Sequence, residues 1–178
     1  MGFMDKLIKT VDVWIPDERQ INLDKGHEFE KHVADLFKLK KDYFAITTWN
    51  TDHSDKRAGI KVESDSNPDF LIRYKPTNEQ FAVECKWRAN PFYNQKIQNY
   101  VIKWAESYQI KNYQQYSKKH NIPVFIVIGL AGKPSKPEYS FCLPLEVAKY
   151  PDIFPSILDK YERIPPNKPF FWKGGILK

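Results

Sequence analysis

The chain has 178 residues, enough for one domain with a hydrophobic core. Its 28 Lys and Arg residues outnumber its 22 Asp and Glu residues, and this basic balance suits a polyanionic partner such as nucleic acid. No apolar run approaches the ~20 residues that span a bilayer, and two cysteines provide neither a disulfide framework nor a four-ligand zinc site. We therefore expect a cytoplasmic protein without membrane contact, forming a single domain over 1–178.

The first segment, Met1–Val13, mixes apolar with charged residues and lacks the apolar stretch of a secretory signal, so it is expected to be an arm. Asp24 is a candidate N-cap for a helix over about 25–39. The apolar stripe of this helix consists of Phe29, Val33, Leu36 and Phe37, at helical spacing.

Three strands are predicted next. Residues 43–49 are rich in β-branched and aromatic side chains, and 51–67 is a polar stretch that predicts a long loop. Residues 69–74 and 80–87 form a predicted hairpin around the turn-forming residues 76–78.

The second half of the chain has a less regular pattern. A loop is predicted over 89–99, a long helix over 100–120, and a buried strand over the apolar run 124–130. Together with the preceding elements this gives a core over about 22–132. After Gly132 we expect an irregular extension over 133–178, with a short strand at 141–143 and short helices at 145–149 and 156–161. The aromatic tail Pro169–Trp172 fits either a core or an interface.

The third predicted strand separates two kinds of side chain. Phe81, Val83 and Cys85 alternate onto one face, as a core requires. Glu84 and Lys86 share the opposite face, with their Cα atoms about 7 Å apart along the strand.

Asp69 opens the partner strand, so hairpin pairing would bring it next to Glu84. Two close carboxylates repel, and a divalent cation relieves that repulsion. Oxygen ligands favour Mg²⁺ or Mn²⁺. Lys86 would then stand beside the metal, able to orient or deprotonate a water molecule.

Pro68-Asp69 followed by Glu84-Cys85-Lys86 resembles the PD-(D/E)XK motif of the restriction-endonuclease-like nucleases. In that superfamily the core runs helix, three strands, helix, strand, with the motif on the second and third strands. The resemblance covers about 26–130 and implies an α/β fold with a restriction-endonuclease-like core, a mixed central sheet flanked by helices.

Two further segments resemble branches of this superfamily. Gly26-His27-Glu28-Phe29-Glu30 is similar to a motif of the Mrr-like and resolvase-like branches, whose first-helix glutamate assists the metal site. This implies a role for Glu30, with Glu28 as its competitor. Gln109 and Tyr113 resemble the Q-x-x-x-Y helix motif of the RecB-like branch and would support the site, with Gln114 and Gln98 as possible substitutes for the glutamine.

The resemblance implies a metal-dependent endonuclease that hydrolyses phosphodiester bonds and leaves 5′-phosphate and 3′-hydroxyl ends. DNA is the expected substrate, with a role in repair, restriction or mobile elements. Asp69, Glu84 and the Cys85 backbone carbonyl would hold Mg²⁺ or Mn²⁺, with Glu30 acting through a second metal or a bound water. Lys86 would position the attacking water and stabilise a phosphoryl oxygen.

Two alternatives stay open. One is a catalytically silent nucleic-acid-binding or assembly module with the same fold, and the other is an unrelated α/β structural protein. A homodimer or a partner protein could supply specificity. Candidate phosphate contacts are Lys40, Lys41, Arg88, Lys96, Lys103 and Lys111.

Overall fold

The computed structural model describes residues 18–50 and 67–178, with side chains from residue 24 onward, so the predicted N-terminal arm and most of the predicted 51–67 loop lie outside it. The centre is a five-stranded sheet in the order β1-β2-β3-β6-β7. Among the strands of this sheet that the structure describes, only the pair β3 and β6 is parallel. The sheet strands are β1 (Phe44–Trp49), β2 (Phe70–Tyr74), β3 (Glu79–Arg88), β6 (Val124–Lys133) and β7 (Lys136–Pro144).

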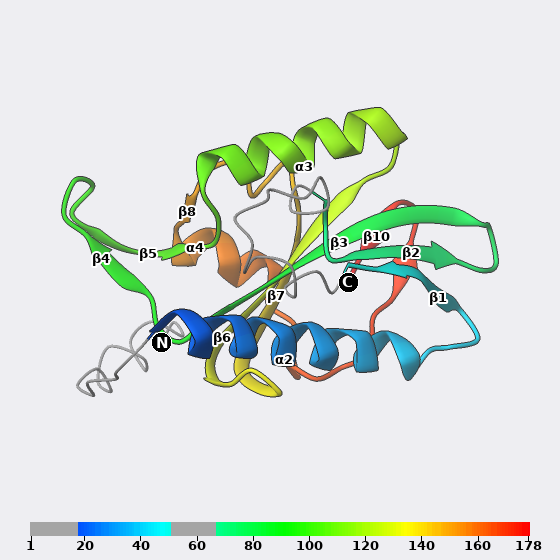
Figure 1. Cartoon of the computed structure of the whole chain (residues 1–178), viewed down its shortest axis with the longest axis horizontal. Helices are drawn as coiled ribbons and strands as arrows, with labels where there is room; N and C mark the ends of the chain where they lie inside the picture. The colour runs from blue at the N-terminus through cyan, green and yellow to red at the C-terminus, as the bar shows by residue number, and fades with distance from the viewer. Residues whose placement is uncertain (1–17, 51–66) are drawn as a thin grey trace.

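Two helices cover opposite faces of this sheet. In Figure 1, α2 (Glu18–Lys38) lies below it and α3 (Ser107–His120) lies above it. The predicted order of helix, three strands, helix and strand is therefore confirmed, as is the mixed sheet flanked by helices.

The alternation of side chains on the strands divides the core into two layers. On the α2 side, Phe29 and Phe37 pack with Phe81, Val83 and residues from β6. On the α3 side, Ile110 and Tyr113 pack with the opposite faces of β3 and β6. Strand β6 is buried on both faces, which explains its continuous apolar sequence.

Helix α2 begins earlier than the sequence predicted. It starts by Glu18, so Asp24 lies inside the helix and the predicted N-cap is wrong. Residues 18–23 contain neither Gly nor Pro and include good helix formers, so nothing prevents the helix from extending in this direction.

The predicted helix over 100–120 is wrong in its first third. Asn99–Lys103 forms β5, which makes a hairpin with β4 (Phe92–Asn94) inside the segment predicted to be loop. Tyr100, Val101 and Ile102 favour a strand. Helix α3 begins after Glu106, whose backbone N–H donates a hydrogen bond of 2.9 Å to Gln109 Oε1 in a capping box.

The segment after Gly132 is more regular than its pattern predicts. The predicted strand at 141–143 is part of β7, which follows a tight turn after β6. Near the end of β6, Gly132 has a φ of 66°, and a Cβ there would lie 2.8 Å from the Lys136 carbonyl oxygen. Residues 145–149 form a turn rather than the predicted helix. The last elements are β8 (Asp152–Ile153), α4 (Pro155–Leu158), the 3₁₀ helix η4 (Asp159–Tyr161), β9 (Trp172–Lys173) and β10 (Ile176–Leu177).

The aromatic tail belongs to the core on the α2 side. The ring of Phe170 stacks on Phe37 with centroids 4.3 Å apart, and the Trp172 ring stacks on Phe81 at 4.4 Å. The tail therefore joins the first helix to the central sheet. Within the described residues, no helix is long and apolar enough to cross a membrane.

We predict that Phe170→Ala lowers the free energy of unfolding by about 3–5 kcal/mol, because it empties a stacked, fully buried position. Its neighbour Phe171 is 59% exposed, and Phe171→Ala should change stability by no more than about 0.5 kcal/mol. Urea unfolding of both variants measures the difference. Equal losses would show that the stack on Phe37 does not stabilise the fold.

Candidate active site

The site lies where β3 continues past the end of β2. Phe70, the first residue of β2, pairs with Val83, so residues 84–88 of β3 have no partner on β2. On its other side β3 stays paired with β6 as far as Arg88. Among the described strands, therefore, none pairs with this edge of β3 beside Glu84, Cys85 and Lys86.

Asp69 occupies this open edge. Its Oδ2 accepts a hydrogen bond of 2.7 Å from the Cys85 backbone N–H. The neighbouring backbone is held by Asn50, whose N–H donates to the Asp69 carbonyl at 2.8 Å and whose side-chain amide donates to the Pro68 carbonyl at 2.7 Å. In an antiparallel ladder the N–H and C=O of one residue point to the same edge, so the Cys85 carbonyl also faces this opening.

Glu84 points to the α3 side of the sheet and is 2% exposed. The Tyr113 hydroxyl donates a hydrogen bond of 2.7 Å to Glu84 Oε1, and Lys86 Nζ lies 2.5 Å from the same oxygen. The other oxygen, Oε2, is buried and has no hydrogen-bond partner among the described residues. Leaving a buried carboxylate oxygen unpaired is costly, and a cation would satisfy it.

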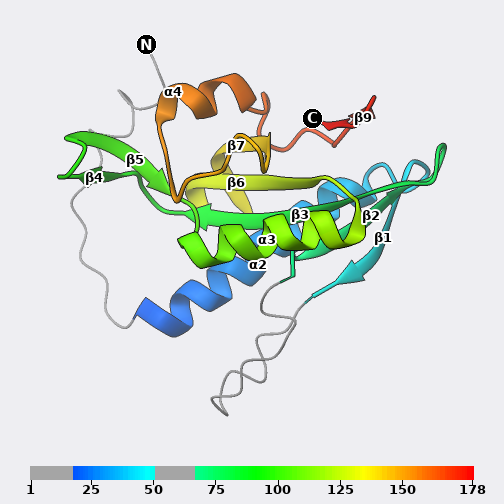
Figure 2. The same cartoon turned by 90° about the horizontal axis from the view of Figure 1, so that it is seen from above.

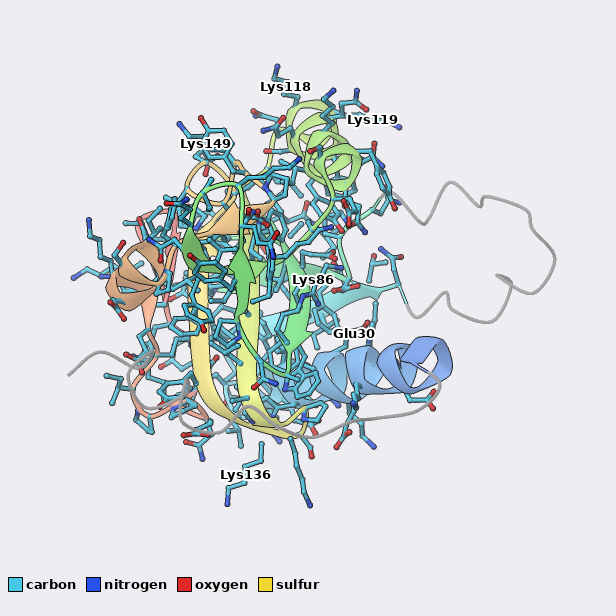
Figure 3. All side chains as sticks on the ribbon, turned by 90° about the vertical axis from the view of Figure 1, so that its left-hand side faces the viewer. Glu30, Lys86, Lys118, Lys119, Lys136 and Lys149 are labelled. Carbon is cyan, nitrogen blue, oxygen red and sulfur yellow. The ribbon has the colours of Figure 1, made fainter. Side chains whose placement is uncertain are left out.

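Glu30 is also buried, just past the middle of α2. Trp49 Nε1 and His27 Nδ1 each lie 3.5 Å from Glu30 Oε2, and the two rings stack with centroids 6.2 Å apart. Figure 3 labels Glu30 on α2 and Lys86 on β3, on the same side of the molecule. Glu28 is exposed, which favours Glu30 over Glu28 as the site residue.

The charges of these groups act on one another. Burial raises the pKa of Asp69 well above its usual value, and the negative charges of Glu84 and Glu30 raise it further, against smaller opposite effects of Lys86 and the Cys85 N–H. Burial alone would lower the pKa of Lys86, but Glu84 and Asp69 outweigh it and the net pKa is raised. Lys86 is thus an ammonium at neutral pH, which favours orienting a water over deprotonating it.

These groups fit a divalent cation held by few side chains. Among the described residues, no three Asp, Glu, His or Cys side chains are arranged to hold a metal ion. Two carboxylates and the Cys85 carbonyl nevertheless make an all-oxygen donor set with one unpaired oxygen, on Glu84. Mg²⁺ is commonly bound through one or two carboxylates and keeps several waters.

The two predicted supporting residues differ in their positions. Tyr113 contacts Glu84 directly, whereas Gln109 caps α3 at Glu106 and lines a hollow beside Arg88. The possible substitutes Gln114 and Gln98 are exposed, and Gln98 lies in the β4–β5 turn. Sequence reasoning missed Asn50, although the side-chain amide of an asparagine next to a strand end commonly bonds to the nearby backbone.

The predicted phosphate contacts are spread over the molecule. The Arg88 guanidinium donates hydrogen bonds to the backbone carbonyls of Trp87, Lys103 and Trp104, which is a structural role. Lys40 and Lys41 precede β1, at the end of the sheet opposite Asp69, because Phe44 pairs with Tyr74 and Trp49 with Phe70. The exposed lysines nearer the β4–β5 hairpin and α3 are Lys96, Lys103 and Lys111.

No protein-family model matches the chain, and a search of curated proteins found no match. Among solved structures, the chain is similar to Hjc, a Holliday junction resolvase from the archaeal hyperthermophile Archaeoglobus fulgidus, at 17% sequence identity and a TM-score of 0.49. The match covers 78% of this chain and 96% of the resolvase chain. A backbone likeness of this degree leaves the function to be inferred from the side chains of the site.

We predict that Asp69→Asn raises the free energy of unfolding at pH 7 in metal-free buffer by about 1 kcal/mol or more, because it removes a charge that the folded state disfavours. The asparagine oxygen can still accept from the Cys85 N–H. Because the pKa of Asp69 is raised in the folded protein, folded Asp69 takes up a proton at a higher pH than unfolded Asp69 does. The loss of stability caused by the Asp69 charge therefore disappears as pH falls from the raised pKa towards 3.8. The advantage of the variant should shrink over the same range.

Urea unfolding between pH 4 and pH 8 measures this effect. Asp42→Asn, at an exposed position, is the matched control and should change stability by no more than about 0.5 kcal/mol. A destabilised Asp69→Asn variant at pH 7 would contradict the crowding of negative charge at the site.

Proposed function

We propose that the protein is a metal-dependent nuclease, with DNA as the expected substrate and with Asp69, Glu84 and Lys86 as its catalytic residues. The observation that carries the proposal is the bond from the Cys85 N–H to Asp69, which places a carboxylate beside the residue between Glu84 and Lys86. The second carboxylate, Glu84, has one oxygen without a partner among the described residues, and its other oxygen pairs with the half-buried ammonium of Lys86.

Asp69, Glu84 and the Cys85 carbonyl would hold Mg²⁺ or Mn²⁺, and Glu30 would act through a second ion or a bound water. When bound, such an ion lowers the pKa of its water and offsets charge on the phosphate in the transition state. Tyr113 keeps Glu84 in place, because burial and the charge of Glu84 raise the pKa of Tyr113 and it remains a protonated donor.

Lys86 would act as a fixed positive charge. Its ammonium is held by Glu84 Oε1 and is partly accessible, with 20% of the side chain exposed. It can therefore donate to a non-bridging phosphate oxygen or hold the attacking water. Water adds to phosphorus, the bond from phosphorus to the 3′-oxygen breaks, and that oxygen takes up a proton, which gives 5′-phosphate and 3′-hydroxyl ends.

The experiment is incubation with labelled single-stranded, duplex and branched DNA and with RNA, in Mg²⁺, in Mn²⁺ and in EDTA. We expect cleavage of DNA with either metal and none in EDTA. Binding without cleavage under every condition would favour the catalytically silent module of the same fold.

We predict that Lys86→Ala lowers the cleavage rate by about a hundredfold or more, through loss of a transition-state contact, while nucleic-acid binding is largely kept. Sequence alone suggests a surface-like lysine, but its pairing with buried Glu84 means that the variant should also lose about 1–3 kcal/mol of stability. Lys86→Arg should not restore cleavage, since a planar guanidinium does not replace a compact ammonium.

Thermal melts and cleavage assays on the same preparations check this prediction. Lys119→Ala, at an exposed lysine near the C-terminal end of α3, is the control and should cut at close to the wild-type rate. If folded Lys86→Ala cuts as fast as the wild type, Lys86 is not catalytic and the motif assignment fails.

A further inference from the structure

The β4–β5 hairpin exposes aromatic side chains that the core does not use. Phe92 is 40% exposed and Tyr93 is 51% exposed, and Ile97 in the turn is 45% exposed. The hairpin stands away from the central sheet at the left of Figure 1, and the view from above in Figure 2 shows the same separation. Exposed rings grouped on a projecting hairpin are typical of a binding surface.

The base of the hairpin is firmly held. Ile102 on β5 pairs with Ile153 on β8, and the Asn94 side-chain amide donates to Asp152 Oδ2 at 2.8 Å. Arg88, at the end of β3, donates from Nε to the Lys103 carbonyl at 2.6 Å. The hairpin is therefore fixed relative to the strand that carries Glu84 and Lys86.

A groove runs from the end of β3 along this hairpin. It consists of two hollows of about 220 Å³ and 550 Å³, which share Phe92, Lys103 and Glu106. Arg88 lines the first hollow and follows Lys86 by two residues on the same face of β3, about 7 Å along the strand. The groove thus begins beside the candidate active site.

The side chains of the groove suit bases better than a continuous line of phosphates. Lys96 and Lys103 line it together with Phe92 and Tyr93, while Glu106 lies 2.5 Å from Lys103 Nζ. Aromatic rings interspersed with lysines bind single strands by stacking on bases and neutralising a few phosphates. Paired bases inside a duplex have both faces covered and cannot stack on a protein ring.

We propose that this groove binds the unpaired bases of a DNA strand next to the scissile phosphate, with Phe92 as one stacking platform and with Tyr93, whose ring lies on the other face of β4 against Tyr100, as a second. The proposal rests on the nuclease function proposed above, and it specifies the substrate class as single-stranded DNA or the unpaired segment of a branched DNA. A strand in the groove would reach Lys86 along the polar face of β3.

The test is fluorescence anisotropy in EDTA, with a labelled single-stranded DNA and a blunt duplex of the same sequence. We expect the wild type to bind the single strand more tightly than the duplex. Tyr93→Leu, which keeps bulk but loses the ring, should weaken single-strand binding about fivefold to a hundredfold. Tyr93→Phe should bind like the wild type, and so should Tyr43→Leu, a matched exposed tyrosine that precedes β1.

A scan with single abasic nucleotides identifies the stacked base. At one position the abasic strand should bind the wild type more weakly but lose nothing further with Tyr93→Leu, because both changes remove the same contact. Wild-type affinity in folded Tyr93→Leu, or additive losses at every position, would overturn the proposal. So would a duplex that binds as tightly as the single strand.

Binding in EDTA separates this proposal from the nuclease proposal. If single-strand binding depends on the ring but no cleavage occurs in Mg²⁺ or Mn²⁺, the groove proposal holds and the nuclease proposal fails. If cleavage depends on metal but neither binding nor cleavage depends on Tyr93, the nuclease proposal holds and the groove proposal fails.

Discussion

The candidate site depends on one hydrogen bond, from the Cys85 N–H to Asp69 Oδ2. Strand β2 begins only at Phe70, which pairs with Val83, so the Cys85 amide has no ladder partner on β2. An unpaired buried N–H is costly, and the Asp69 carboxylate satisfies it. The same bond holds an acid beside Glu84 and Lys86, so one requirement of the backbone also brings the charged groups together.

The arrangement is electrostatically unfavourable without a cation. Asp69, Glu84 and Glu30 are close enough that Glu84 and Glu30 raise the pKa of Asp69. Lys86 and Tyr113 both act on one oxygen of Glu84, which leaves the second oxygen without a partner in the described chain. Sites that trade stability for function commonly show such crowding, because a ligand or an ion supplies the missing charge.

The spacing of apolar residues along the chain correctly predicted which faces of β3 and α2 are apolar and buried. Alternation along β3 placed Glu84 and Lys86 on one face, and helical spacing identified Phe29 and Phe37 as the buried stripe of α2. The start of α2 could not be located, because residues 18–23 contain no residue that ends a helix.

Features that depend on distant partners could not be predicted. Arg88 donates to carbonyls up to 16 residues away along the chain. Because these contacts are not visible in the sequence, Arg88 was predicted to contact phosphate. The β4–β5 hairpin follows Asn90 and Pro91, which favour a loop, and its pairing with β8 depends on a segment about fifty residues later. Each of these roles follows from tertiary contacts rather than from the type of the residue.

The stack of Phe170 on Phe37 and of Trp172 on Phe81 has a consequence for the order of events during synthesis. Helix α2, which carries Glu30, is among the first described elements to leave the ribosome, yet residues that cover it are among the last. The apolar face of α2 therefore stays incompletely covered until Phe170 has left the ribosome. A nascent chain stalled before Phe170 would have the motif residues but not the finished core behind them, so the core on the α2 side is completed only after Phe170 and Trp172 have been translated.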